Sequence, residues 1–569
     1  MKSIVSITVW LLFCSIGGFA NQTPNKNFDA STLPKYALSI RVMPDAHRIE
    51  VTGTVSFPAA NFSRDSLELS LSELMTDFRV EVVGPEGAAG HAQTEKIAVR
   101  PYSRPGWGTA TWRVHLPHKI NANAPPLLRF SYTGGGAQTS FIFSLESEVC
   151  FGAGIGTAWY PEIEDGPVQS DGRLRGLRGT GSLNFFVPPG YVLESQGLPL
   201  SKPEEISRGE FRFDIHDPVF FAFVAGRYTV QHGHGRIPTA LYLLKPRANA
   251  DSYLTGSEKV LESLVHEFGP YPHPAFAILE VPGEQADRAG FSGASLESFM
   301  LSNTDFLDKD FNTAFFGHEI SHQWWGNLVR SKTVQGRWMM SEGMAQYGSL
   351  RAVEMLEGAA AAERYRRRGY PDYISDQNAL GYFNLIAKGT DHRLSDLPQD
   401  GDLSRLLSNS KGFIVWDMLS REVGGSRFSQ ILQKFIRENA YQRVDWNQYL
   451  RAIENGAGRN LRWFYDQWFE RIGAPDFEMN WKQDGRRLHG VITQRPPYYQ
   501  ATLEIEVKNN RGRRLVRTVR VRQAQTSFSF SIDFRADSAV LDPHYLVLRW
   551  TPEFRAGPTA ARLSSQLDQ

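Results

Sequence analysis

Two histidines and a glutamate in the segment GHEISHQWWGN (317–327) form the pattern in this sequence with the clearest chemical meaning. If the segment is helical, residues four positions apart share a face, so His318 and His322 can direct two imidazoles towards one ion. Imidazole nitrogen is a common zinc ligand, and a catalytic zinc site uses three protein ligands and keeps one position for water. Glu319 follows the first histidine, where its carboxylate can accept a proton from that water. The pattern predicts a hydrolytic zinc site, against the alternative of a helix that carries two histidines without a metal.

The third ligand must come from another part of the chain, and Glu342 is the candidate. It lies near the start of a second expected helix, RWMMSEGMAQYGSLRAVEML (337–356), among methionine residues. A carboxylate with apolar neighbours is costly to bury unless a cation compensates its charge. The alternative is an exposed glutamate that the helix dipole favours in the first turn. Together with the histidines, Glu342 completes an expected ligand set for one zinc ion per chain.

The elements that must position these residues follow from the hydrophobic periodicity of three regions. Residues 34–230 alternate apolar and polar side chains between Gly and Pro turns, which predicts an N-terminal β-sandwich. Residues 231–474 contain a buried strand and then long stretches with helical spacing, which predicts a mixed α and β domain around the zinc site. Residues 475–552 return to alternation and predict a small C-terminal β-sandwich, followed by a flexible polar tail at 553–569. The expected fold class is therefore multidomain α+β.

Composition excludes one broad class of partner and leaves others open. The 569 residues carry 62 basic and 61 acidic side chains, a formal net charge of +1, whereas nucleic-acid-binding proteins usually have a basic excess. The basic run at 364–368 is expected to form a solvated helix face. No partner nucleic acid is therefore expected, and the sequence does not determine the oligomeric state.

The N-terminal segment MKSIVSITVWLLFCSIGGFA (1–20) has the pattern of a signal peptide. A lysine precedes an apolar run that ends in small residues, and such segments are cleaved during export. An uncleaved anchor is the alternative, although the run is shorter than the ~20 residues of a spanning helix. We expect a secreted or periplasmic protein with no stable membrane span after removal of the signal.

The segments HEISHQWWGNLV (318–329) and WMMSEGMAQY (338–347) together resemble the aminopeptidase N family of zinc metallopeptidases (gluzincins). Two further segments agree in order, FGPYPHPAFAILEVP (268–282) and LRWFYDQWFERIGAPDF (461–477). The resemblance implies an N-terminal β-sandwich, a thermolysin-like α/β catalytic domain and a small C-terminal β-sandwich. It also implies a shorter member that lacks the family's large helical C-terminal domain. The implied activity is that of a zinc metallo-aminopeptidase acting on peptide substrates.

Two segments near the zinc motif depart from the family's pattern. Nineteen residues separate His322 from Glu342, one more than usual in the family, and an insertion in the intervening loop would absorb the difference. GASLES (293–298) stands where the family has G-A-M-E-N, with one residue inserted. By the resemblance, Glu297 binds the substrate's free amino terminus; the alternative is a glutamate on a surface loop.

A third departure lies at Asn409, two residues before a Lys-Gly pair. The family has a tyrosine at this place, and its hydroxyl stabilises the oxyanion that forms during peptide hydrolysis. The resemblance therefore assigns Asn409 to the substrate side of the site, with Tyr382 or Tyr347 as alternative donors. Loss of one oxyanion donor typically costs ~2.7–4 kcal/mol in the transition state.

Three hypotheses for function remain open from the sequence. In the first, Glu319 acts as the base of a zinc aminopeptidase and Glu297 anchors the amino terminus. In the second, which Asn409 favours, the protein retains zinc and binds peptides with little turnover. In the third, the same zinc site serves an endopeptidase, which requires that Glu297 binds no amino terminus.

Overall fold

The computed structural model describes residues 33–555 except 57–65, 84–88, 101–107, 117–126, 138, 140–142, 154–158, 164–175, 371–375 and 399–400. The expected signal peptide therefore lies outside the described residues, as does most of the expected tail. The chain forms two compact units. Unit 1 holds the described residues of 1–170, 175–255 and 272–311, and unit 2 holds those of 256–271 and 312–569. Within the described ranges, no helix combines the length and apolar character needed to span a bilayer.

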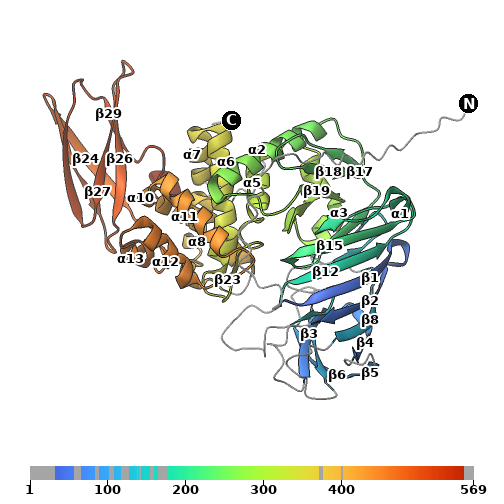
Figure 1. The fold of residues 1–569 in the computed structure, drawn as a ribbon. Coiled ribbons are helices and arrows are strands. Elements are labelled where there is room, and N and C mark those ends of the chain that lie inside the picture. The colour runs from blue at the N-terminus through green and yellow to red at the C-terminus, as the bar shows by residue number, and fades with distance from the viewer. Residues whose placement is uncertain are drawn as a thin grey trace, which may run out of the picture. The chain divides into compact units, whose positions relative to one another are not determined.

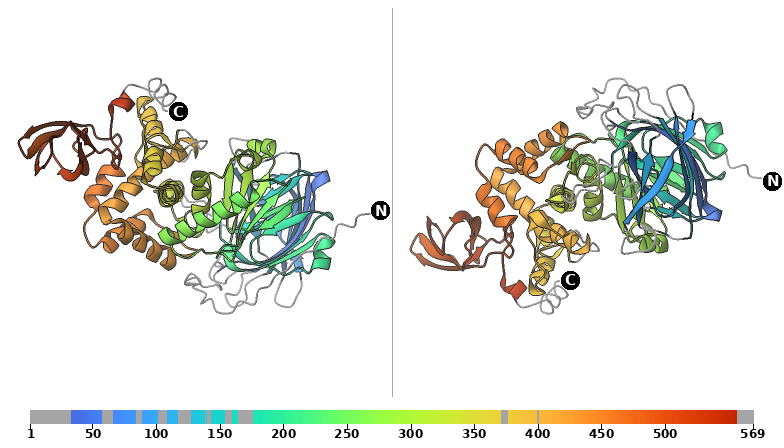
Figure 2. Two further views of the ribbon diagram at one scale, coloured as in Figure 1. Left: turned by 90° about the horizontal axis from the view of Figure 1, so that it is seen from above. Right: turned by 90° about the horizontal axis from the view of Figure 1, so that it is seen from below.

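Unit 1 is built mainly from strands, which Figures 1 and 2 show in blue to green. Its largest sheet has eight strands, in the order β14 (Leu198–Pro199), β15 (Glu210–Val219), β12 (Gly179–Phe186), β1 (Lys35–Met43), β2 (Arg48–Ser56), β8 (Leu127–Gly135), β4 (Met75–Val83) and β5 (Ala89–His91). One four-stranded sheet contains β13 (Val192–Ser195), β16 (Phe223–Gly226), β10 (Val149–Gly152) and β9 (Phe143–Leu145). The other contains β11 (Glu162–Ile163), β3 (Ser66–Ser72), β7 (Thr109–His115) and β6 (Gln93–Arg100). A short helix, α1 (Pro203–Ser207), precedes β15.

Alternation along these strands produces the core of unit 1. On β1, the side chains of Tyr36, Leu38 and Ile40 are buried, whereas the intervening residues face outward or are partly exposed. The period of two places every second side chain on the same face, so one face of the sheet is apolar. β1 pairs parallel with β12 and antiparallel with β2, and the apolar face packs into one large hydrophobic cluster.

A five-stranded sheet completes unit 1 and carries the GASLES segment. Its order is β17 (Thr229–His232), β18 (Thr239–Leu243), β19 (Phe276–Val281), β21 (Phe299–Asn303) and β20 (Gly293–Leu296). β18, β19 and β21 run parallel, and β20 and β21 form an antiparallel pair. Helix α2 (Ala250–Phe268) follows β18 in the chain, and its residues from 256 onward belong to unit 2. Two short helices of unit 1, α3 (Gly283–Ala289) and α4 (Thr304–Leu307), contact β21.

Unit 2 begins with helices, shown from green to orange in Figure 1. In chain order they are α5 (Thr313–Ser321), a π-helical turn η4 (Met339–Gly343), α6 (Met344–Glu357), α7 (Ala359–Arg368), α8 (Ala379–Ala387), α9 (Gly401–Leu407), a second π-helical turn η6 (Ser408–Gly412), α10 (Phe413–Val423), α11 (Gly425–Glu438), α12 (Trp446–Ala457) and α13 (Arg462–Trp468). Two short strands, β22 (Arg330–Ser331) and β23 (Arg443–Val444), pair in parallel.

The remainder of unit 2 forms two three-stranded sheets, which Figure 2 shows in dark red as two facing layers. One contains β24 (Phe477–Asp484), β25 (Arg487–Gln494) and β28 (Gln525–Ser531). The other contains β27 (Arg514–Val521), β26 (Ala501–Lys508) and β29 (Ser538–Leu541), and α14 (Pro552–Arg555) follows. The β-rich N-terminal region, the helical region and the C-terminal sheets confirm the multidomain α+β fold class. The two units divide the chain differently from the predicted domains 34–230, 231–474 and 475–552, because residues 231–255 and 272–311 belong to unit 1. The predicted boundaries stay predictions.

The basic run at 364–368 is not simply a solvated face. The Arg366 side chain is 1% exposed, and its guanidinium lies 3.4 Å from the Asp417 carboxylate on α10. Its neighbours Arg367 and Arg368 pair with Glu553 at 2.9 and 2.8 Å. The expectation is wrong because a helix turns one residue of the run inward, where a buried carboxylate compensates its charge.

Candidate metal centre

Helices α5 and α6 approach closely because small residues line the surface between them. A Cβ atom on Gly348 would lie 2.1 Å from Ser321 Oγ, and one on Gly317 would lie 3.0 Å from Ser349 Cα. Ser349 Oγ donates to the carbonyl of Ala314 at 2.6 Å and ties α6 to α5. At the start of α5, the side chain of Asn312 accepts the Phe315 N–H at 2.8 Å and caps the helix. The close approach brings the histidines of α5 beside the start of α6.

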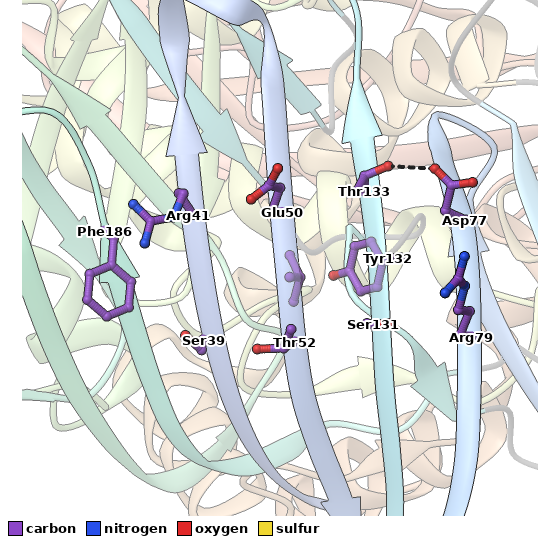
Figure 3. A pocket seen from close by; sticks show the side chains of 11 residues that line it. Ser39, Arg41, Glu50, Thr52, Asp77, Arg79, Ser131, Tyr132, Thr133 and Phe186 are labelled. Carbon is purple, nitrogen blue, oxygen red and sulfur yellow. Dashed lines mark hydrogen bonds between the residues drawn. The ribbon is translucent and has the colours of Figure 1, made fainter. Parts of the chain in front are cut away.

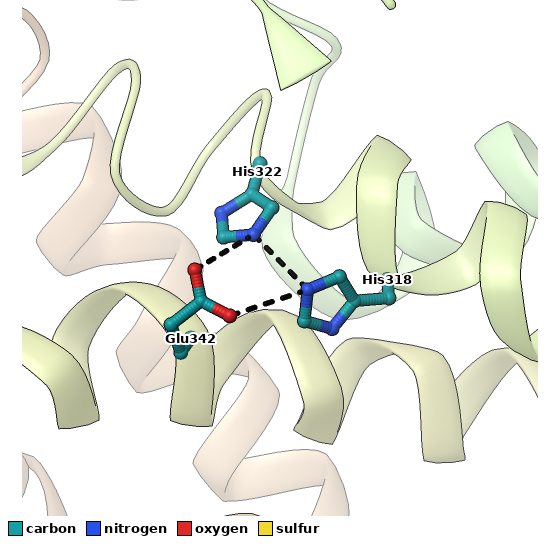
Figure 4. Close-up of side chains that lie close together, drawn as sticks. All are labelled: His318, His322 and Glu342. Atoms are coloured by element: carbon teal, nitrogen blue, oxygen red, sulfur yellow. Dashed lines mark hydrogen bonds and ion pairs between the residues drawn. The ribbon is translucent and has the colours of Figure 1, made fainter. Parts of the chain in front are cut away.

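Three side chains converge where these helices meet. His318 Nε2 and His322 Nε2 lie 3.2 Å apart, and the Glu342 carboxylate oxygens lie 3.5 Å from the former and 3.6 Å from the latter. Figure 4 shows the three groups directed towards one point. Three ligand atoms placed tetrahedrally ~2.0–2.1 Å from one zinc ion would lie about 3.3 Å from one another. The donor set and its spacing therefore fit a zinc ion, as the sequence predicts.

Glu342 occupies a π-helical turn, η4, at the start of the α6 region. A π turn contains one residue more than an α turn, and such turns are frequent at functional sites. The turn therefore offers a place, besides the loop, for the additional residue between His322 and Glu342. The Trp416 indole N–H donates to the carbonyl of Met339 at 3.1 Å and holds η4 against α10.

An outer hydrogen bond fixes the orientation of the His322 imidazole. His322 Nδ1 donates to the carbonyl of Trp325 at 2.9 Å, so the proton resides on Nδ1 and Nε2 is left as the ligand atom. Burial lowers the pKa of His318, but its interactions with Glu342, with smaller contributions from Glu319 and the Gln346 side chain, raise that pKa above its usual value. His318 Nδ1 and Gln346 Oε1 are both buried and make no hydrogen bond within the described residues.

Electrostatics favour the ionised form of Glu342 and the neutral form of His322. Burial disfavours ionisation of Glu342, but its hydrogen bond with His318 and the nearby imidazoles keep the pKa of that carboxyl well below its usual value. Burial lowers the pKa of His322, and the Glu342 charge only partly opposes this shift. Metal ligands of these types bind as carboxylate and neutral imidazole. The site thus presents an anion and at least one neutral imidazole near neutral pH.

Glu319 lies on α5 beside the cluster and is 8% exposed. Its charge acts on His318 and raises the pKa of that imidazole, which places the carboxylate near the ligands without making it one of the three converging groups. This is the position that the sequence pattern predicts for a general base, although its role stays a prediction.

Asn409 contacts a ligand of the cluster. It lies on the second π turn, η6, and its Nδ2 donates to Glu342 Oε2 at 3.0 Å. The alternative donors are engaged elsewhere: the Tyr382 hydroxyl donates to Asp391 at 2.8 Å, and the Tyr347 hydroxyl donates to Glu267 at 2.7 Å. Within the described part of the chain neither hydroxyl contacts the cluster, so the oxyanion donor stays unassigned.

Glu297 belongs to unit 1, at the tight turn between β20 and β21. It is 6% exposed, so it is not a surface-loop glutamate. Its Oε1 lies 3.0 Å from Arg178 Nη2, and its Oε2 accepts the Phe220 N–H at 2.9 Å. The adjacent Ser298 has φ 75°, a conformation that L residues rarely adopt. Both carboxylate oxygens are thus held in place.

Unit 1 also has a hollow of about 510 Å³ on the eight-stranded sheet, which includes none of the sequence-predicted site residues. In Figure 3 the Thr133 hydroxyl points to Asp77. On the same face the Arg41 guanidinium lies 5.5 Å from the centre of the Phe186 ring. These side chains satisfy one another as on a solvated sheet face. These contacts therefore do not indicate a catalytic or binding site in the hollow.

Comparison with known proteins gives consistent matches. Residues 295–468 match the family model described as "Peptidase family M1 domain". The chain is 23% identical over 240 residues to tricorn protease-interacting factor F2 of Thermoplasma volcanium. This match covers 41% of this chain and 29% of that protein. It is 24% identical over 222 residues to aminopeptidase N of Lactococcus lactis, covering 36% of this chain and 24% of the relative.

A solved structure shares the fold over most of the chain. The crystal structure of Legionella pneumophila aminopeptidase A in complex with aspartic acid aligns with a TM-score of 0.63 and 14% identity. The alignment covers 94% of this chain and 61% of that structure, and the matched regions of the two curated relatives are less than a third of their lengths.

Proposed function

We infer that this chain, which carries a peptidase family M1 domain over residues 295–468, is a zinc metallopeptidase that removes residues from the amino terminus of peptides. The observation that carries the proposal is the convergence of His318, His322 and Glu342, whose ligand atoms all lie within 4.8 Å of one another. These three residues would hold the ion. The names of several relatives, among them aminopeptidase N, support the choice of an aminopeptidase.

Each protein group near the ion has a separate task in this proposal. When bound, zinc would polarise the scissile carbonyl and lower the pKa of water. The Glu319 carboxylate accepts a proton from the attacking water and later delivers it to the leaving amine. The contact of His322 Nδ1 with the Trp325 carbonyl keeps the Nε2 atom of that imidazole facing the ion site.

Selectivity for amino termini would come from Glu297. Its carboxylate can pair with a substrate ammonium, and its contact with the Phe220 N–H keeps it oriented. One observation favours the endopeptidase alternative: Arg178 already pairs with this carboxylate and offsets its charge. The balance between the two activities therefore depends on how far Arg178 competes with the substrate's ammonium.

A panel of amino-acid amides and short peptides, each with a free or an acetylated amino terminus, tests the proposal on zinc-loaded protein. An aminopeptidase hydrolyses the free forms and leaves the acetylated forms intact. Equal hydrolysis of both forms would identify an endopeptidase. Tight peptide binding without turnover would favour the zinc-retaining binding protein.

We also propose that the protein is secreted or periplasmic, on the sequence of residues 1–20 alone. Intact-mass analysis of the protein from its native source should then give a chain that begins at Asn21 or close to it. A chain that retains Met1 would contradict cleavage and favour the anchor.

A further inference from the structure

The resemblance places Asn409 where the family has an oxyanion donor, but the contacts of Asn409 indicate a different role. Its side chain is 1% exposed and lies on the π turn η6, which packs against the π turn η4 that carries Glu342. Its Nδ2 lies 3.0 Å from Glu342 Oε2. The amide is therefore directed at the expected third ligand of the metal.

The chemistry of the two groups fixes the direction of this hydrogen bond. A carboxylate that binds a metal is ionised and has only acceptor atoms. The amide must therefore present its nitrogen to Glu342, and one N–H of Asn409 is committed to the ligand. A charge-assisted hydrogen bond of this kind is stronger than one between neutral groups.

We propose that Asn409 is a positioning residue that holds the Glu342 carboxylate in the orientation required to bind the metal. The proposal rests on the zinc site inferred above. A carboxylate turns readily about its terminal torsion, and a donor on Oε2 restricts that motion. Ligands of bound metals usually have such outer partners. Asn409 gives Glu342 the support that Trp325 gives His322.

The surroundings of Asn409 are rigid enough for this role. The next lysine, Lys411, is fully buried, and its Nζ donates to the carbonyl of Arg471 at 2.9 Å. On the other turn, Met339 is held by the Trp416 indole. A Cβ on Gly412 would lie 2.7 Å from Met339 Sδ, so the two turns are in direct contact. The amide cannot swing away without disturbing this packing.

The test measures zinc affinity by competition with a chromophoric chelator, separately from peptide hydrolysis at saturating zinc. Asn409→Ala removes the donor, and Asn409→Asp keeps the shape but replaces the donor with a second carboxylate. Both should lower zinc affinity by ~10–100-fold, as is typical for loss of an outer partner. The visible spectrum of the cobalt-substituted protein should also change. Ser410→Ala, on the same π turn, is the control and should keep wild-type affinity, because Ser410 Oγ donates to the Leu406 carbonyl and not to a group of the metal site.

Unchanged zinc affinity in both variants, together with a fall in turnover of ~10²–10³, would overturn the proposal and return Asn409 to the role of an oxyanion donor. Thermal unfolding of the zinc-free proteins shows whether the variants fold. If the Ala variant does not fold, the zinc affinity of the nearly isosteric Asp variant tests the proposal. Failure of the proposed zinc site can be distinguished from failure of this proposal. If the wild-type protein binds no zinc, the metal titration shows it before any variant is measured. A wild-type protein that binds zinc without hydrolysing peptides still allows the affinity comparison.

Discussion

Two imidazoles and a carboxylate bind one cation only when each is held in a suitable tautomer and orientation. In this protein a backbone carbonyl fixes His322 and Asn409 holds Glu342, whereas the Gln346 side chain acts on His318 only weakly. The convergence of these three side chains was predictable from the sequence pattern. Their outer partners were not, because a carbonyl such as that of Trp325 leaves no sequence signal. Gln346, four residues after Glu342, could have been found from helical spacing.

At the residue scale, Glu342→Ala should abolish stoichiometric zinc binding. It removes one of three ligands and also leaves the Asn409 amide without its acceptor. Metal analysis after dialysis measures the effect. Glu357→Ala is a matched control, because Glu357 is an exposed glutamate at the other end of α6. Full zinc occupancy in the Glu342 variant would remove this residue from the ligand set.

Glu319→Gln should separate metal binding from proton transfer. The amide keeps the size of the side chain but accepts no proton, so zinc content should stay at the wild-type level while hydrolysis falls. General acid–base help is typically worth ~10²–10⁴-fold in rate. Turnover of an amino-acid amide at saturating zinc provides the measurement. If most of the rate persisted, another group would have to be the base.

At the scale of elements, the site depends on how closely α5 and α6 approach. The sequence predicts both helices, but it does not reveal that Gly317, Ser321, Gly348 and Ser349 allow their backbones to come together. The π turns η4 and η6 were equally unpredictable, because the sequence pattern of an α-helix and that of a helix with one π turn differ by a single residue.

Gly348→Val should weaken both the fold and the metal site. The added side chain would overlap Ser321 Oγ and approach the Phe268 ring, at 2.1 and 2.8 Å from its Cβ. Overpacking of this kind typically costs ~1–3 kcal/mol of unfolding free energy. Denaturant unfolding and zinc titration measure the two effects. Gly425→Ala serves as the control, because its Cβ would meet no atom within 4 Å. Equal behaviour of the two variants would show that the helix contact is not essential.

At the scale of the whole molecule, alternation and helical spacing predict the order of strand-rich and helical regions correctly. Long-range pairing could not be predicted in this way. The parallel contact of β1 with β12 joins residues about 145 positions apart, at Lys35 and Thr180. Buried charges such as Arg366 were also missed, because their partners lie on other helices and the local sequence contains only the basic residue.

Stability of the molecule should depend on pH through Glu194 in unit 1. This side chain lies on β13 and accepts a hydrogen bond from the Tyr242 hydroxyl, and burial raises its pKa from 4.5 to about 7 despite that bond. Below about pH 4.5 the group is protonated in both the folded and the unfolded chain. Between that value and about pH 7, the unfolded chain loses the proton first, so stability falls as the pH rises.

A shift of this size corresponds to about 3 kcal/mol of unfolding free energy, lost as the pH rises from about 4.5 to about 7. Glu194→Gln retains the acceptor for Tyr242 but does not titrate, so the variant should lack this part of the pH dependence. Denaturant unfolding of both proteins at pH 5 and pH 8, with zinc removed, isolates the effect from metal binding. The difference between wild type and variant should favour the variant at pH 8. If the two proteins showed the same pH dependence, Glu194 would titrate alike in the folded and unfolded chains, and its burial would not control stability in this range.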